Sequence, residues 1–269
     1  MNETEPSSLR LCFGRQVRAL REFHELTRDD VGGPCHVSGS LIGAIERGER
    51  IPDESLIRKL DTTLKANGLL ASAADYMAAE KYRAFFRDFV IHERQCFALN
   101  TYAPLAVPGL LQTEEYARAT FRMYAPALDE DDIEKQVAAR LERQRLFERP
   151  AKPYLGFVIE ESVLRRPLGG RAVHRDQLLR LLERARLPYL TLQVMPTAVE
   201  EHAALHGYLT LLTTKEHRHV AYVEHQRGSE LTGDQKKVGR FIQRYGILRA
   251  QALSPPESAS LIEKLAGEL

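Results

Sequence analysis

The spacing of the hydrophobic positions changes near the middle of the chain. Residues 9–66 predict several short helices with sharp turns between them, and 70–94 continues as an Ala-rich, charged helical pattern. After the turn VPGLLQT, further helices are predicted from Thr113 and through 129–148. The first half of the chain is therefore predicted to be helical.

Short runs rich in β-branched and aromatic residues follow, bounded by Pro, Gly or polar clusters, and such runs are typical of strands. They predict four strands at 154–164, 189–195, 207–213 and 220–225. Between the first two strands, apolar residues of 174–187 recur at helical spacing, and a final helical stretch follows Thr232. The fold class predicted for the whole chain is α+β, with a small mixed or antiparallel sheet in its second half.

These patterns divide the chain into three parts. An all-α domain is predicted at 1–66, connecting helices at 67–100, and an α+β domain at 101–269. A length of 269 residues is sufficient for two domains. The sequence contains no internal repeat and no low-complexity segment.

The composition restricts the class of protein but does not indicate a binding partner. Hydrophobic residues make up 43% and charged residues 28%, which excludes a largely disordered chain, and the net charge is +1. No run approaches the roughly 18 apolar residues of a membrane span, and MNETEPSSLR has acids where a signal peptide has bases. We therefore expect a cytoplasmic protein that does not enter a membrane.

The segment VGGPCHVSGSLIGAIERG at 31–48 contains five glycines and a Cys-His pair. A phosphate loop is excluded because no strand precedes it and no GK[ST] follows. A metal site is disfavoured because the neighbours Cys35 and His36 seldom point at one ion and no second pair lies nearby. The chain also lacks GxSxG, HExxH and Rossmann glycine patterns, so we expect no catalytic residues, metal or cofactor.

Two helix N-termini with the same capping pattern are predicted, one just before this segment and one within it. Thr27 and Ser38 are good N-caps, and Asp29 and Asp30 lie in a first turn, where the helix dipole favours anions. Gly48 supplies a stop after the second helix. Hydrophobic staples pair Leu26 with Val31 and Val37 with Ile42. Two short helices about ten residues apart predict a helix-turn-helix.

The second of these helices has an apolar and a small polar face. At ~100° per residue, Ile42 and Ile45 point inward together. The opposite face carries Ser40, Gly43, Ala44 and Arg47. That face would enter the major groove deeply but offers few bidentate contacts to bases. Glu46 lies at the inward edge, where an unpaired carboxylate is costly, so we expect it to pair with Arg21.

The stretch 26–52 resembles the Cro-repressor-like (Xre-type) helix-turn-helix family. The matching positions are Arg21, Leu26, Thr27, Val31, Val37, Ser38, Ile42, Ile45, Glu46, Arg47, Gly48 and Pro52. The resemblance implies DNA contact by Arg28, Ser38, Ser40, Ala44 and Arg47, to which we add the helix glycines Gly39 and Gly43. It departs from the family at Gly32-Gly33-Pro34, where relatives continue a helix, so we expect a short or mobile supporting helix.

Charge within the predicted DNA-binding domain is balanced. Residues 7–66 hold ten Lys and Arg against nine Asp and Glu, a balance of +1, so phosphate affinity should be modest. Two copies would compensate, and the resemblance implies a homodimer on palindromic double-stranded DNA.

The rest of the chain carries a second resemblance. The sequence FFRDFVIHERQCFALNTYAPLAVPGLLQTEEYARA, followed by ESVLRRPLGG, QVMP, VAYVEH and ALSPPESASLI, resembles the domain of unknown function behind this helix-turn-helix in many actinobacterial antitoxin-like (WhiJ-like) regulators. The resemblance implies a repressor or antitoxin-like role, controlled by a small protein encoded nearby or by a small ligand. Leu110, Leu111 and Tyr116 are the candidate partner-binding surface, although the same residues are equally typical of a core.

Three further groups in the second half carry a functional and a structural interpretation. His202 and His206 have metal-ligand spacing if helical, but they are also typical of a solvated loop. One charged group is typical either of a pocket rim or of a solvated strand end, and consists of Glu160, Glu161, Arg165 and Arg166. An arginine series is typical either of nucleic-acid binding or of an ordinary charged helix face, and consists of Arg140, Arg143, Arg145 and Arg149.

The sequence thus predicts a sequence-specific DNA-binding transcriptional regulator controlled through its C-terminal domain, and not an enzyme. The alternative is a protein-interaction hub or antitoxin with weak or no DNA binding, because the predicted recognition face is small and its supporting helix contains glycines.

Overall fold

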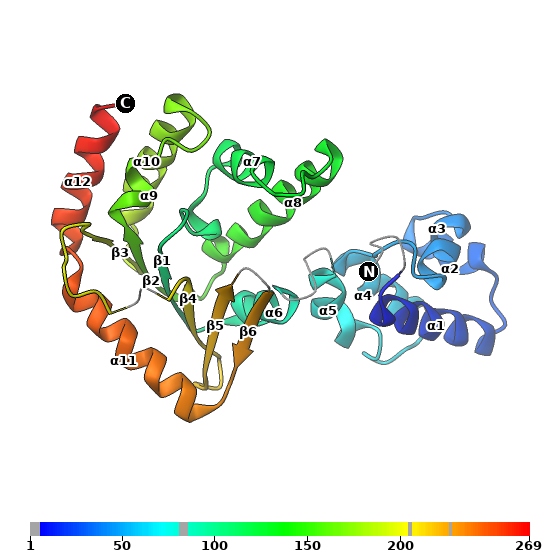
Figure 1. Cartoon of the computed structure of the whole chain (residues 1–269). Coiled ribbons are helices and arrows are strands. Elements are labelled where there is room, and N and C mark those ends of the chain that lie inside the picture. Colours follow the sequence, from blue (N-terminus) through cyan, green and yellow to red (C-terminus); the bar gives the residue numbers. More distant parts are fainter. Residues whose placement is uncertain (1–5, 81–85, 204–205, 226–227) are drawn as a thin grey trace. The chain divides into compact units, whose positions relative to one another are not determined.

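The chain forms two compact units, Met1–Arg87 and Asp88–Leu269. A computed structural model of the whole chain shows both units, and its residues 6–80, 86–203, 206–225 and 228–269 are described (Figure 1). The division falls within the stretch that the sequence predicted to be connecting helices. In the part of the chain that is described, every helix is too short or too polar to cross a membrane.

The first unit is entirely helical in its described residues. Its elements are α1 (Ser8–Phe23), α2 (Arg28–Cys35), α3 (Gly39–Glu46), α4 (Glu54–Thr63), the 3-10 helix η1 (Ala71–Ala73) and α5 (Ala74–Ala79). A polar side chain caps the first residues of each of α1 to α4. The caps are Ser7, Thr27, Ser38 and Asp53, and each accepts a hydrogen bond from the backbone amide three residues later. Local sequence therefore defines where these four helices begin.

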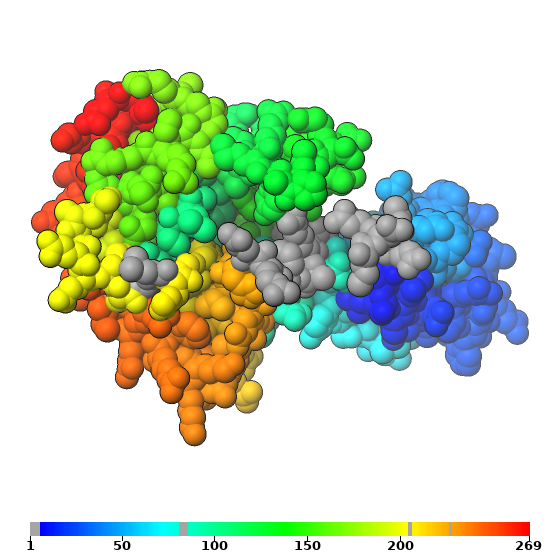
Figure 2. All heavy atoms as spheres, in the orientation of Figure 1, coloured from blue at the N-terminus to red at the C-terminus, as the bar shows by residue number. Residues whose placement is uncertain are grey.

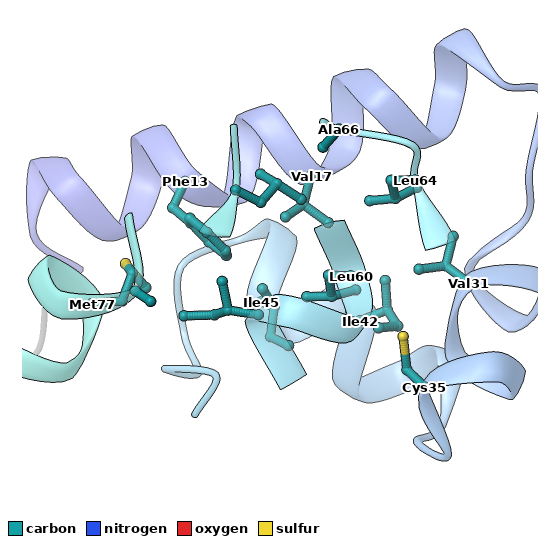
Figure 3. Packing of buried hydrophobic residues seen from close by; sticks show 13 residues of the cluster. Phe13, Val17, Val31, Cys35, Ile42, Ile45, Leu60, Leu64, Ala66 and Met77 are labelled. Carbon is teal, nitrogen blue, oxygen red and sulfur yellow. The ribbon is translucent and has the colours of Figure 1, made fainter. Parts of the chain in front are cut away.

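One hydrophobic core holds the four helices together (Figure 3). Val17 of α1, Ile42 of α3 and Leu60 of α4 are fully buried in it. The side chains of Leu26 and Val37, which precede α2 and α3, pack against the same core, as expected for hydrophobic staples. The core thus fixes how α3 lies against α1 and α4.

The second unit is built on a six-stranded mixed sheet. Its strands are β1 (Ala98–Ala103), β2 (Tyr154–Glu160), β3 (Leu190–Met195), β4 (Leu209–Thr213), β5 (His219–His225) and β6 (Gly228–Thr232), in the order β3-β2-β1-β4-β5-β6. The pairs β1–β2 and β2–β3 are parallel, and the three pairs from β1–β4 to β5–β6 are antiparallel. The predicted α+β class with a mixed sheet is therefore confirmed.

Helices cover both faces of this sheet. Phe89 of α6 contacts Tyr222 on the face opposite α11. The described helices of this unit are α6 (Arg87–Gln95), which starts at the last residue of the first unit, η3 (Gly109–Leu111), α7 (Glu114–Arg122), α8 (Glu130–Arg143), η4 (Gln144–Glu148), α9 (Glu161–Arg165), α10 (Arg171–Ala185), α11 (Gln235–Gln251) and α12 (Pro255–Gly267). Alternate residues of β1, β4 and β5, including Tyr102, Leu211 and Ala221, form a core with Val238 and Leu248 of α11. α7 and α8 pack on each other around a separate apolar cluster (Figure 1).

The structure corrects the predicted strands in two places and the predicted helices in one. β1 and β6 were not predicted, so the sheet has six described strands where the sequence suggested four. The strand predicted at 154–164 ends at Glu160, and Glu161–Arg165 is helical. The final helical stretch consists of two helices, because Ser254 caps α12 and a proline occupies its first turn.

Candidate nucleic-acid interface

The turn between α2 and α3 is defined by capping at both ends. Thr27 and Asp30 form a reciprocal capping box at the start of α2. α2 ends at Cys35, and the C-cap residue His36 has a left-handed backbone with φ of 60° and donates its amide to the Gly33 carbonyl oxygen. Ser38 then caps α3 by accepting a hydrogen bond from the Leu41 amide at 3.3 Å. The two helices therefore meet at a short, closed turn.

Gly32-Gly33-Pro34 lies inside α2 and does not interrupt it. The helix runs through Pro34 to Cys35, and its eight residues equal the length of α3. Gly32 is required here because a Cβ at this position would lie 2.5 Å from the Val37 carbonyl oxygen. Gly32 therefore allows the close approach of the turn to α2.

The accessible face of α3 carries most of the residues predicted to contact DNA. Ser38, Ser40 and Arg47 are exposed and Ala44 is half-buried, whereas Ile42 and Ile45 are buried in the core. The Ser38 and Ser40 hydroxyl groups lie 2.9 Å apart and are hydrogen-bonded. This arrangement presents a small, polar surface of the size that fits a major groove.

The two helix glycines do not belong to this exposed face. Gly39 is buried and its amide donates to the Asp29 carboxylate at 3.2 Å. Gly43 is also buried, and a Cβ there would lie 3.3 Å from the Arg28 guanidinium carbon. The prediction that Gly39 and Gly43 contact DNA is therefore wrong for this structure, because both positions are used for the close packing of α2 on α3.

A buried carboxylate at the end of α3 binds two arginines. Glu46 accepts Arg21 Nε at 2.6 Å and Arg28 Nε at 2.9 Å, and its side chain is 1% exposed. Burial alone would raise the pKa of Glu46, but the hydrogen bonds and positive charges of the two arginines outweigh it and lower this pKa. The predicted Arg21–Glu46 pair is confirmed, and the second partner, Arg28, was not predicted.

This ion cluster ties three helices into one body. Arg21 belongs to α1, Arg28 begins α2 and Glu46 ends α3. Arg21 also donates Nη1 to the Leu26 carbonyl oxygen at 3.0 Å, which fixes the turn between α1 and α2. The exposed face of α3 is therefore held on a rigid support.

Both arginines on the rim of the candidate interface are already paired. Arg28 is 45% exposed at its side chain and binds Glu46, while Arg47 binds Glu49 through two hydrogen bonds of 2.8 Å. The Arg47–Glu49 pair is about half exposed on both sides. Surface pairs of this kind are weak and exchange partners readily.

The apolar residues predicted to bind a partner lie inside the second unit. Leu110, Leu111 and Tyr116 are 3%, 1% and 1% exposed, and the Tyr116 hydroxyl accepts a hydrogen bond from the Val107 amide. Thr113 caps α7 as predicted from the sequence. The prediction of a partner surface at these three residues is wrong, because their side chains are part of the core and are not available to a second protein.

The two histidines of the candidate metal pair do not lie on a helix. His202 Nε2 lies 2.9 Å from Glu160 Oε1, and the Tyr102 hydroxyl donates to the same oxygen at 2.9 Å. His206 lies in an exposed turn, so the two histidines do not share a helix face. Among the described residues, no three His, Cys, Asp or Glu side chains gather closely enough to hold an ion.

The remaining charged candidates are mostly used within the unit. Glu161 pairs with Arg165 and accepts the Thr197 amide, which lowers the pKa of Glu161. Three of the four arginines from 140 to 149 turn inward. Arg140 binds Gln112, Arg143 binds Glu93, Arg149 binds the Cys96 carbonyl, and Arg145 is exposed. This series is not a free basic surface.

Comparison with known families supports both halves of this description. Residues 13–73 match the family described as a helix-turn-helix domain, and residues 86–264 match the family described as a domain of unknown function, DUF5753. No curated protein and no solved structure matches the chain.

Proposed function

Because the chain belongs to the DUF5753 family and carries a helix-turn-helix domain, we propose that it is a sequence-specific transcriptional regulator rather than an enzyme. The observation that carries the proposal is the exposed face of α3. Ser40, Ala44 and Arg47 are accessible on it, while Ile42 and Ile45 anchor it in the core. A helix supported in this way can enter the major groove without rearranging its domain.

The proposed DNA target is a palindromic operator bound by a homodimer. One α3 offers a single guanidinium and two hydroxyl groups at its exposed surface, which gives few bidentate contacts to bases. Specific complexes reach dissociation constants of roughly 10⁻⁸ M or lower. Two copies of α3 on neighbouring half-sites supply the contacts that one copy lacks.

We further propose that the DUF5753 unit controls DNA binding, in a repressor or antitoxin-like role. It comprises most of the chain and has its own sheet and core. A small protein or a small ligand that binds this unit would regulate only if its affinity differs between the free and DNA-bound states.

A mobility-shift assay on the DNA flanking the gene tests the proposal. Ser40→Glu with Ala44→Glu places two carboxylates on the exposed face of α3, and we expect operator binding to be lost through repulsion by phosphates. The matched control is Ser55→Glu with Thr62→Glu, which adds the same charge to exposed positions of α4 and should retain most of the affinity. Equal operator affinity in the two double variants would overturn the assignment of α3.

One observation favours the alternative of a protein-interaction hub. Both arginines at the rim of α3 are neutralised within the unit, Arg28 by Glu46 and Arg47 by Glu49. If this neutralisation persists on DNA, phosphate binding is weak and the DUF5753 unit carries the main function. A chain that binds a partner but shows no footprint on any fragment of its own promoter would support the hub.

A further inference from the structure

A short row of polar side chains crosses one face of the sheet in the DUF5753 unit. Strand residues alternate between faces, and the face opposite α11 carries Thr101 of β1, Thr210 of β4 and Tyr222 of β5 in register. The Thr101 and Thr210 hydroxyl groups are hydrogen-bonded at 2.9 Å in the interior. A row of buried polar side chains across the middle of a sheet is more than packing requires, since apolar residues would fill the same space without a need for partners.

An arginine of α8 on this side of the unit is fully paired. Arg143 donates Nε and Nη2 to the two carboxylate oxygens of Glu93 at 2.8 and 2.6 Å, and both side chains are nearly inaccessible. This two-donor edge is the geometry in which a guanidinium binds a carboxylate most strongly. Arg143 therefore has a structural partner in α6.

Arg140, one turn earlier in α8, lacks such a partner. Its Nη1 donates to the neutral Gln112 side chain at 2.8 Å, and its guanidinium carbon lies 4.2 Å above the Phe121 ring. In the described part of the chain, its Nε and Nη2 make no hydrogen bond or ion pair, so the edge that Glu93 fills on Arg143 is open on Arg140. The side chain is half-buried and keeps accessible surface.

Partial burial makes the unpaired guanidinium edge of Arg140 energetically unfavourable. Burial, and next the charge of Arg143, lower the pKa of Arg140 to about 10, which remains well above neutral pH. Arg140 is therefore a partly desolvated cation without a carboxylate in contact. Buried charges in folded proteins are normally paired, so an anion from outside the chain would complete the site.

Ring contacts connect a second donor, Tyr208, to this part of α8. The Tyr208 ring lies 6.5 Å from the Tyr222 ring, the Tyr222 ring lies 4.3 Å from the Phe89 ring, and the guanidinium carbon of Arg143 lies 6.0 Å from the Phe89 ring. The Tyr208 hydroxyl accepts a hydrogen bond from Thr210 at 3.1 Å, and its own proton has no acceptor among the described residues. Burial raises the pKa of Tyr208 to about 12, so the hydroxyl stays protonated and can donate. The exposed Glu224 side chain accepts the Tyr222 hydroxyl at 2.9 Å, which places a carboxylate beside the Tyr222 ring that Tyr208 contacts.

We propose that Arg140 and Tyr208 bind the carboxylate of a small organic acid in the DUF5753 unit. One guanidinium edge and one hydroxyl supply three donors, which suits the two oxygens of a carboxylate. A phosphate carries more negative charge than a carboxylate, and the Glu224 carboxylate, which is hydrogen-bonded to Tyr222, would repel it more strongly. Glu224 would instead accept a hydrogen bond from a hydroxyl group elsewhere on the ligand, and Phe121 offers an aromatic surface beside the site.

Ligand binding can be tested on the full chain without DNA. The probes are 4-hydroxybenzoate and benzoate, with uncharged 4-hydroxybenzamide and inorganic phosphate as controls, and the readout is calorimetry together with the melting temperature. We expect both carboxylates to bind and raise the melting temperature, 4-hydroxybenzoate severalfold more tightly, and both controls to bind at least tenfold more weakly. No binding of either carboxylate, or binding of phosphate alone, would overturn the proposal.

Two variants separate a ligand site from a structural role of Arg140. Arg140→Met keeps an apolar stem over Phe121 and removes the charge, and Arg145→Met is the matched control at an exposed position that follows α8. A ligand site predicts that Arg140→Met melts at the same or a higher temperature than the original chain and no longer binds 4-hydroxybenzoate. A lower melting temperature with unchanged binding would instead show that Arg140 is structural.

The regulatory consequence rests on the proposed function, whereas binding itself does not. If 4-hydroxybenzoate binds and operator affinity shifts at least threefold, the site controls the regulator. If it binds while the chain has no operator, the inference stands and the proposed function fails.

Discussion

Gly14 of α1 lies against the backbone of Glu46 at the end of α3. A Cβ at Gly14 would come within 2.5 Å of the carbonyl oxygens of both Ile45 and Glu46, a distance that real side chains do not adopt. Because the obstructing atoms are backbone, they cannot move aside as the end of a flexible side chain would. The position of α3 thus depends on the absence of a side chain in α1.

We expect Gly14→Ala to destabilise the first unit by about 2 kcal/mol, because overpacking outweighs the better helix propensity of alanine. Gly246→Ala is the matched control, since nothing lies within 4 Å of a Cβ at that exposed position of α11. It should stabilise the second unit by about 0.5–1 kcal/mol. Hydrogen exchange of the α3 and α11 amides measures the two effects separately, and equal protection of α3 in both variants would contradict the argument.

Glu46 should make the first unit sensitive to acid. Its folded-state pKa is lowered, so its contribution to the free energy of unfolding is present above the unfolded pKa of about 4.3 and is lost as pH falls through the folded value. Glu46→Gln should cost roughly 3 kcal/mol at pH 7 and progressively less in acid, because two arginines lose their charge partner. Glu49→Gln, in an exposed pair, should change stability by less than about 1 kcal/mol. Protection of the α3 amides that does not depend on pH in the original chain would refute this.

The rim arginines should contribute phosphate contacts. We expect Arg28→Ala and Arg47→Ala each to reduce the slope of log affinity against log salt by about 1, with similar effects on all DNA sequences. A change in base preference at a single operator position would show instead that the arginine reads a base.

Because Arg47 is paired with Glu49, removing the charge of Glu49 should strengthen DNA binding, whereas removing Arg47 should weaken it. Glu49 competes with phosphate for this guanidinium, so Glu49→Gln should strengthen DNA binding, by about fivefold if the pair is worth ~1 kcal/mol. Glu54→Gln, which affects an exposed pair with Arg58 in α4, is the control and should leave the affinity nearly unchanged. Weaker binding of the Glu49 variant would mean that Glu49 positions Arg47 and does not compete for it.

A homodimer should bind the operator. Light scattering is expected to give twice the chain mass on DNA, and footprinting should protect two half-sites about one helical turn apart. A single chain on a single protected half-site would contradict this prediction.

The helical unit was predictable because its signals are local. Thr27 and Ser38 cap helices of this unit through hydrogen bonds within three residues, as Thr113 does for α7 in the second unit, and a short sequence window contains both partners. β1 was missed because its sequence ALNTYA mixes polar and apolar residues, and only its two neighbouring strands in the sheet make it a strand. β6 is a short strand with a glycine and little apolar content, and its pairing with β5 defines it.

The candidate site was also predictable only where the geometry of a single helix determines it. Helical geometry placed Ile42 and Ile45 inward and Glu46 at the edge, which was enough to predict its pair with Arg21. The burial of Gly39 and Gly43 depends on how closely α2 approaches α3, and a helical wheel for one helix contains no information on that distance. The polar row of the sheet was not predictable, because Thr101, Thr210 and Tyr222 meet only through the pairing of β1, β4 and β5. The sequence also could not show that Arg140 lies over the Phe121 ring.

The shortness of α3 limits how much sequence information the chain can read. Its eight residues, at ~1.5 Å per residue, give a helix about 12 Å long. That length spans roughly four base pairs spaced ~3.4 Å apart. A given sequence of four base pairs recurs by chance about every 256 positions, and a pair of such sequences at fixed spacing recurs about every 65,000 positions. A genome offers roughly 10⁶ or more competing sites. A regulator that depends on this helix would therefore occupy many chance sites unless the two half-sites, their spacing and the shape of the DNA between them are all selected together.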